Sequence, residues 1–245
     1  MTDLVFFQAA LILGLGYTVL GITGFGSALV IVPLLANFLP LTEVVALVIL
    51  LDIPASILHG GLNLRQVQWQ EMRRLLPGMA VGTLAGLWLL GELDRRWPLF
   101  MLGCYVVLVG VRALLPRAAD AHRASAAWAY PAGALMGLIE VMFATAGPVV
   151  VAWLQRRLKE VAQIRATVPV IMVLAGCIAV VVLLASGRVD TGVIVWRWLY
   201  GIPIALAGVL LGNRIAARLP PRTMGRLIAF LLTLSGLSLM RHVFA

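Results

Sequence analysis

Residues 21–33 read GITGFGSALVIVP, and three glycines in this stretch interrupt an otherwise continuous apolar run. Glycine costs about 1 kcal/mol against alanine inside a helix, so this density predicts a helix that stops and restarts. Inside a membrane such a break leaves backbone groups unpaired, which is tolerated only where protein or a water-filled cavity covers them. The stretch is therefore a candidate binding site. The alternative is a hairpin turn or a packing face, because glycines let membrane helices approach closely.

The composition predicts an integral membrane protein. Hydrophobic residues make up 62% of the 245 positions and charged residues 12%, with a mean hydropathy of +1.03, whereas soluble domains carry about 25% charged residues. The segments between apolar runs are too short for a soluble catalytic domain, and the chain has no HExxH, GxSxG or CxxC motif. Cys104 and Cys177 stand singly in apolar runs, which argues against disulfides and metal sites. We expect no enzyme activity, no cofactor and no metal.

The apolar segments fall into two similar series. The first half, 1–115, holds a short pair followed by three longer runs, at 4–21, 25–39, 42–60, 75–91 and 97–115. After a linker over 116–126, the second half, 127–245, repeats this order at 127–141, 144–154, 166–186, 192–212 and 226–240. Placing residues 26–28 over 145–147 gives an offset of 119, and placing Ala46 over Ala166 gives 120. The predicted fold class is an all-α integral membrane protein of two repeats. Each repeat has a broken helix pair and three transmembrane helices, which gives eight full or near-full spans to ten segments in total.

The basic residues predict the orientation of the chain, because cytoplasmic loops of membrane proteins carry an excess of Lys and Arg. Alternating the segments across the bilayer gathers most of the 19 basic residues on one side, including those in the loops 63–74 and 155–165. That side is predicted to be cytoplasmic. Both termini then lie on the non-cytoplasmic side of the inner or plasma membrane. Because each half has an odd number of segments, the second repeat is expected to be inverted relative to the first.

The net charge of +9 raises the question of whether the protein binds anionic lipid headgroups or nucleic acid. Since the basic residues lie mainly in predicted cytoplasmic loops, we expect them to contact a bilayer with anionic headgroups rather than nucleic acid. A homodimer is an open alternative to a single copy.

Two motifs carry a family resemblance. Residues 24–35, GFGSALVIVPLL, resemble the glycine-rich run ending in Val-Pro-Leu-Leu of the sulfite exporter TauE/SafE family, and residues 147–151, GPVVV, resemble its second copy. The resemblance implies a secondary transporter that moves small anions such as sulfite, sulfonates or organosulfur acids by alternating access. Ser27 and Ala28 stand where the family usually has glycine, which leaves the substrate open.

The two junctions are the predicted substrate site. Helix N-termini present free N–H groups and a partial positive charge to an anion, and hydroxyl groups add donors. The expected substrate-binding residues are those at the two breaks: Thr23, Gly24, Phe25, Gly26, Ser27, Thr145, Ala146 and Gly147. We expect the two breaks to meet near the membrane midplane around one polar cavity. The alternative is that they are tight turns whose small residues only permit close packing.

Asp52 and Glu140 are the acids that fall inside apolar runs. An ionised carboxylate at mid-membrane is costly and therefore a functional hypothesis by default, so both are candidates for proton coupling. The alternative for each is a structural role, with the carboxyl protonated or bonded to a helix end. His59 lies near the end of its span, where a role at the membrane interface is favoured over a proton relay.

Three functions remain open from the sequence. The leading one is a secondary transporter of a small anionic, sulfur-containing substrate. The second is a channel-like pore for a small solute, which the same broken helices would line. The third is a non-transport membrane subunit.

Overall fold

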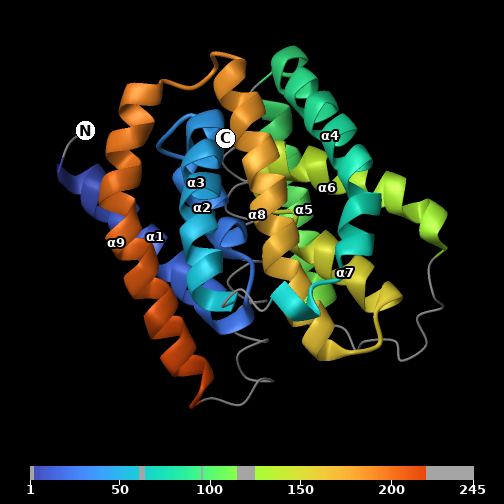
Figure 1. Ribbon diagram of the computed structural model, residues 1–245. Helices are drawn as coiled ribbons and strands as arrows, with labels where there is room; N and C mark the ends of the chain where they lie inside the picture. Colours follow the sequence, from blue (N-terminus) through green and yellow to red (C-terminus); the bar gives the residue numbers. More distant parts are fainter. Residues whose placement is uncertain (1–2, 61–63, 95, 115–124, 219–245) are drawn as a thin grey trace.

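The computed structural model describes residues 3–60, 64–94, 96–114 and 125–218, and this part of the chain is entirely helical (Figure 1). Its α-helices are, in chain order, α1 (Asp3–Thr23), α2 (Ser27–Leu35), α3 (Leu41–Gly60), α4 (Trp69–Glu92), α5 (Arg96–Leu114), α6 (Ala129–Phe143), α7 (Gly147–Arg157), α8 (Val161–Ala185) and α9 (Thr191–Ala216). Single 3₁₀ turns lie at Leu64–Gln66 and Ala126–Trp128.

The described helices include six that are long and apolar enough to cross a membrane. These stretches are Phe6–Thr23, Leu41–His59, Trp69–Glu92, Ala126–Phe143, Ala162–Ala185 and Thr191–Ala216. By contrast, α2 and α7 have 9 and 11 residues, which at 1.5 Å per residue is about 14 and 17 Å, roughly half of a bilayer core. The prediction of an all-α multi-pass membrane protein is confirmed. The predicted segment 226–240 lies outside the described residues.

The first helix is longer than predicted. It was expected to end at residue 21, but α1 continues through Thr23 and has 21 residues, about 31 Å at 1.5 Å per residue. The Thr23 hydroxyl donates to the Val19 carbonyl at 2.9 Å, and the Gly24 N–H donates to the Leu20 carbonyl at 2.7 Å. These bonds extend the helix by two residues beyond the predicted end. Helix α1 is therefore long enough to cross the membrane, whereas α2 is not.

The two predicted polar loops, 63–74 and 155–165, are shorter than expected because α4 begins before Arg74 and α7 continues through Arg157. Glu71 is buried and pairs with both arginines, with 2.8 Å between nitrogen and oxygen in each pair. This ion-pair network neutralises the charges at the helix ends. The helices therefore extend beyond the apolar runs that the sequence shows.

Helices α4 and α6 pack closely through glycines. A Cβ atom on Gly82 would clash with the Ala134 backbone, and one on Gly137 would clash with the Met79 carbonyl. Gly78 lies against Tyr130, earlier on α6, so residue numbers rise together along both helices. The two helices are therefore parallel, and only glycine permits this backbone approach.

Helices α1 and α9 form the second close pair in the same way. Gly208 packs against the Gly14 carbonyl, and Gly212 packs against Gly21. This pair is also parallel. Both pairs thus join the first α-helix of one half of the chain to the fourth α-helix of the other half.

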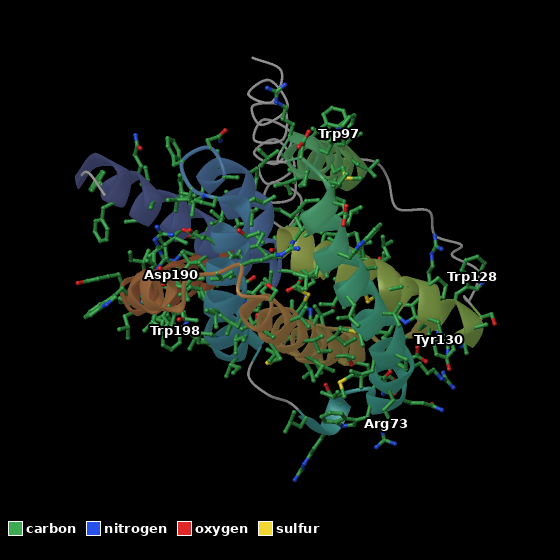
Figure 2. The ribbon with its side chains drawn as sticks, turned by 90° about the horizontal axis from the view of Figure 1, so that it is seen from above. Arg73, Trp97, Trp128, Tyr130, Asp190 and Trp198 are labelled. Carbon is green, nitrogen blue, oxygen red and sulfur yellow. The ribbon has the colours of Figure 1, made fainter. Side chains whose placement is uncertain are left out.

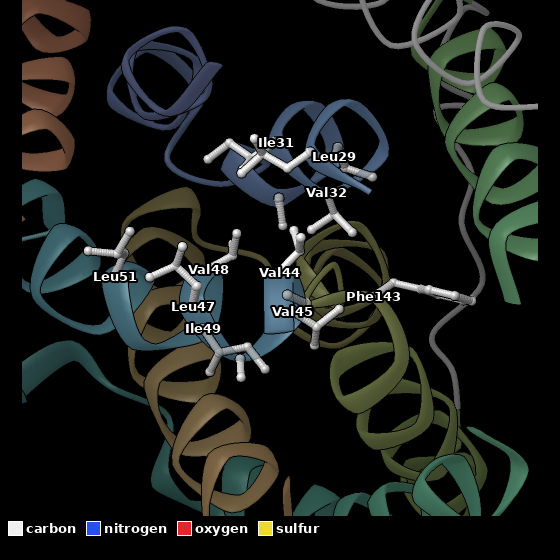
Figure 3. Packing of buried hydrophobic residues seen from close by; sticks show 14 of the residues in the cluster. Leu29, Ile31, Val32, Val44, Val45, Leu47, Val48, Ile49, Leu51 and Phe143 are labelled. Atoms are coloured by element: carbon white, nitrogen blue, oxygen red, sulfur yellow. The ribbon is translucent and has the colours of Figure 1, made fainter. Parts of the chain in front are cut away.

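Helix α3 lies at the centre of the bundle, against α8 and α9 (Figure 1). Figure 3 shows α2 lying over it, with Ile31 and Val32 facing Val44 and Val48. All four side chains are at most 1% exposed. The short helix α2 is therefore held inside protein rather than in lipid, as an interrupted helix requires.

Aromatic side chains stand on the outside of the bundle. Figure 2 shows Trp97, Trp128 and Tyr130 at its periphery, and all three are exposed. Exposed Trp and Tyr are typical of the two membrane–water interfaces.

Candidate functional site

The first junction, between α1 and α2, depends on two left-handed glycines. Gly24 has a φ of 83° and Gly26 a φ of 95°, a backbone region that favours glycine because it has no Cβ. Helix α2 then begins at Ser27. Sequence reasoning expected a break over these residues, and the structure has one.

The second junction, between α6 and α7, repeats the first part of this geometry 120 positions later, but Ala146, the residue before α7, is right-handed with a φ of −66°, whereas Gly26 is left-handed. The Ala144 N–H donates to the Glu140 carbonyl at 2.7 Å, as Gly24 does to Leu20. Ala144 is left-handed with a φ of 55°, and α7 begins at Gly147. The two junctions are therefore related by an offset of 120, and the offset of 119, which placed Gly26 over Thr145, is wrong by one residue.

Both junctions line one pocket, as the sequence led us to expect. Its lining includes the break residues Gly24, Phe25, Gly26, Ser27, Thr145 and Gly147, together with Asp52 and Ser56 from α3. The space between them holds about one water molecule. Among the described residues that line it, none is basic.

Two of the predicted site residues stand apart from this lining. The Thr23 hydroxyl lies within hydrogen-bond distance of the Val19 and Phe25 carbonyls, which share its single proton. The Ala146 side chain is not in the lining, and its N–H is engaged by the Glu140 carboxyl. Through these hydrogen bonds, Thr23 helps to fix the backbone of the first junction and Ala146 that of the second.

Asp52 faces the pocket from the middle of α3. The Ser27 hydroxyl, at the start of α2, donates to its Oδ1 at 2.8 Å. The buried Tyr17 of α1 lies beside the same carboxyl and donates to the Val48 carbonyl at 3.3 Å. Asp52 is thus held at the place where α1, α2 and α3 meet.

Glu140 has a different setting. Its side chain is 2% exposed, and its Oε2 accepts the Ala146 N–H at 3.0 Å. This bond satisfies an N–H at the beginning of α7 that has no partner within the helix. The position 120 residues earlier is Leu20, so the first junction has no equivalent acid. The geometry favours the structural alternative for Glu140.

Thr145 is the unsatisfied member of the site. The residue is 2% exposed, and its hydroxyl has no hydrogen-bond partner among the described residues. Its backbone carbonyl accepts the Tyr105 hydroxyl at 2.8 Å, which fixes the position of the residue. Since nearly all buried polar groups in proteins are paired, this hydroxyl is available to a molecule that enters the pocket.

Ser56 and Tyr105 were missed by sequence reasoning. Ser56 lies four residues after Asp52 on a helix, a spacing that places both side chains on one face, so the sequence carried a usable signal. Tyr105 acts through a contact 40 positions away, and no local pattern indicates such a contact.

His59 also contributes more than the sequence suggested. Its Nδ1 lies 2.8 Å from Oδ1 of Asn213 on α9. On the other side of the ring, Nε2 lies 3.1 Å from where a Cβ of Gly24 would stand. His59 therefore connects α3, α9 and the first junction one turn beyond the pocket.

Comparison with known proteins identifies the family of the chain. The model of the sulfite exporter TauE/SafE family matches residues 9–239. The chain belongs to this family. A relative, the probable inner membrane transporter protein TsaS of Comamonas testosteroni, is 58% identical over 198 residues, which cover 80% of this chain and 82% of the relative. No solved structure matches the chain significantly. The resemblance seen in residues 24–35 is confirmed, and the chain is a membrane transporter of the TauE/SafE type.

Proposed function

We propose that the protein is a secondary transporter that carries small sulfur-containing anions, such as sulfite or sulfonates, across the inner membrane by alternating access. Family membership supports transport in general. The class of substrate rests on the pocket between the two broken helices and on the family resemblance.

The observation that carries this proposal is the unpaired, buried hydroxyl of Thr145 in that pocket. It stands two residues before α7, while Ser27 begins α2 on the other side. Two helix N-termini offer partial positive charge without a basic side chain. A tetrahedral or pyramidal oxyanion has several acceptor oxygens, and it would satisfy the hydroxyl and the N-terminal N–H groups together.

Asp52 is the proposed coupling group. An anion that binds beside an ionised carboxylate is repelled by it, so binding favours the form of Asp52 that carries a proton. Glu140 is already engaged with the Ala146 N–H. Of the two acids, Asp52 is therefore the better candidate for moving a proton with the substrate.

An inverted repeat is the proposed framework for alternating access. Helix α9 runs parallel to α3, because Glu43 pairs with Arg197 near one end and His59 with Asn213 near the other. Figure 1 shows α3 and α4 running in opposite directions. Since α1 is parallel to α9, and α6 to α4, α1 and α6 run in opposite directions. This arrangement supports two halves, 1–115 and 127–245, of opposite orientation around a shared site.

Counterflow in proteoliposomes tests the transport mechanism. Vesicles loaded with unlabelled sulfite should accumulate labelled sulfite transiently and with saturation, because a carrier exchanges its substrate across the membrane. A small alkyl sulfonate and thiosulfate serve as further substrates. Flux that neither saturates nor shows counterflow would indicate a channel-like pore instead.

Thr145 variants test the site. In Thr145→Val the unpaired hydroxyl is replaced by a methyl group, so we expect unchanged or higher thermal stability together with a KM raised about tenfold or more, the effect of losing a hydrogen bond to a charged ligand. Thr145→Ser is the matched control and should stay near wild type. Lower stability with unchanged KM would show a purely structural hydroxyl.

A further inference from the structure

A second hollow lies away from the polar pocket, between α1, α9 and the chain that follows α2. Its volume is about 380 Å³. Its lining is apolar and aromatic except for one charged side chain, Arg197. The polar pocket and its hydroxyls are absent from this lining, so the hollow is a separate feature.

The hollow is a groove with a buried floor and an exposed rim. Leu35 and Leu47 on its floor are 1% and 4% exposed, whereas Phe6 and Trp196 at its rim are 50% and 64% exposed. Both helices that form the rim, α1 and α9, are candidate membrane spans. The groove therefore opens towards the bilayer, and hydrocarbon is the medium that reaches it.

The rim has the chemistry of a lipid headgroup region. Trp196 stacks on Tyr200 with ring centroids 6.4 Å apart, and Phe6 meets Tyr200 edge-on at 5.9 Å. Arg197 lies between these rings in sequence and pairs with Glu43 through Nη1. An arginine can hold a carboxylate and a phosphate together, because its guanidinium carries five N–H donors in a planar fork.

We propose that this groove binds one phospholipid, with an acyl chain on the leucine floor and the phosphate on Arg197. Charge complementarity supports this occupant, because Arg197 stands among the aromatic side chains of the rim and the apolar floor is buried between the helices. The floor includes Leu35, the last residue of α2. A bound acyl chain therefore packs behind the short helix whose first residue lines the polar pocket.

Photocrosslinking tests the groove. The purified full-length protein is incubated with phosphatidylglycerol that carries a diazirine in its acyl chain, irradiated, digested and mapped by mass spectrometry. We expect cross-links at floor residues, which protein otherwise buries: Leu13, Leu35, Leu39 and Leu47. Ala10→Phe fills the groove and should abolish them. Leu11→Phe, at an exposed neighbouring position of α1, is the matched control and should retain them.

Cross-links confined to exposed lipid-facing positions such as Val181 and Leu210, with none on the floor, would overturn the proposal. The headgroup assignment has its own test, in which a diazirine diacylglycerol without phosphate replaces the phospholipid. Wild type should prefer the phospholipid, and the double variant Glu43→Gln, Arg197→Gln should label equally with both. Equal labelling of wild type would overturn the assignment of phosphate to Arg197.

Discussion

At the scale of single residues, Asp52 and Glu140 are both buried acids, but their partners separate them. Asp52 accepts a hydrogen bond from the Ser27 hydroxyl in the pocket, whereas Glu140 accepts one from the Ala146 backbone N–H at the start of α7. We predict that Asp52→Asn abolishes transport driven by a proton gradient and retains exchange at equal pH. Fluxes measured in proteoliposomes with and without the gradient check this. Full proton-driven transport by the Asn variant would make Asp52 structural.

Glu140→Gln should affect stability rather than proton coupling, in contrast to Asp52→Asn. The amide oxygen is a weaker acceptor for the Ala146 N–H than a carboxylate, and hydrogen bonds to charged groups contribute about 1.5–3 kcal/mol. We predict a lower midpoint of thermal unfolding, with proton-gradient dependence retained. Loss of gradient dependence in a stable Gln variant would return Glu140 to the coupling mechanism.

Replacing Ala144 by glycine should stabilise the protein. Its left-handed backbone, with a φ of 55°, costs a residue with a Cβ roughly 1–2 kcal/mol, and the equivalent position in the first junction is Gly24. We predict that Ala144→Gly raises thermal stability, and that Gly24→Ala lowers it. Thermal unfolding of both variants in detergent checks the pair. A destabilised Ala144→Gly would show that its methyl group packs usefully.

At the scale of helices, close backbone approach should decide how glycine substitutions behave. Alanine is the better helix former by about 1 kcal/mol, yet a Cβ on Gly82 meets the Ala134 backbone, whereas one on Gly14 has its nearest neighbour at 3.9 Å. We predict that Gly82→Ala is strongly destabilising and that Gly14→Ala is neutral or stabilising. Detergent unfolding curves distinguish them. Similar behaviour of the two variants would mean that α4 and α6 do not pack through these glycines.

The features that depend on local composition could be predicted from the sequence. The glycines of residues 21–33 predicted the first break, and apolar length predicted the helices. Sequence reasoning could not supply what depends on distant contacts. The continuation of α7 rests on Arg157 and Glu71, which lie 86 positions apart. Likewise, the availability of the Thr145 hydroxyl follows from the arrangement of its neighbours, and no letter in the sequence encodes it.

At the scale of the whole molecule, α1 and α9 run in the same direction, so the end of α9 lies opposite the start of α1. With the last predicted segment, 226–240, crossing back, we predict both termini on the non-cytoplasmic side. Thr2→Cys and Phe244→Cys, each in a background with Cys104 and Cys177 replaced by alanine, should react with an impermeant maleimide in intact spheroplasts. Lys159→Cys is the control and should react only after permeabilisation. Protection of either terminus would contradict the inverted repeat.

The glycine-lined pairing of α1 with α9 has a consequence for biogenesis. Gly14 leaves the ribosome long before Gly208, so α1 enters the bilayer with its small-residue face against lipid before α9 has been synthesised. Membrane helices insert before they associate, which makes this order feasible. It also means that neither half of the chain acquires its close helix pair alone. If translation stopped before α9, the glycine face of α1 would stay uncovered. We expect quality-control proteases to recognise such a product by this uncovered face.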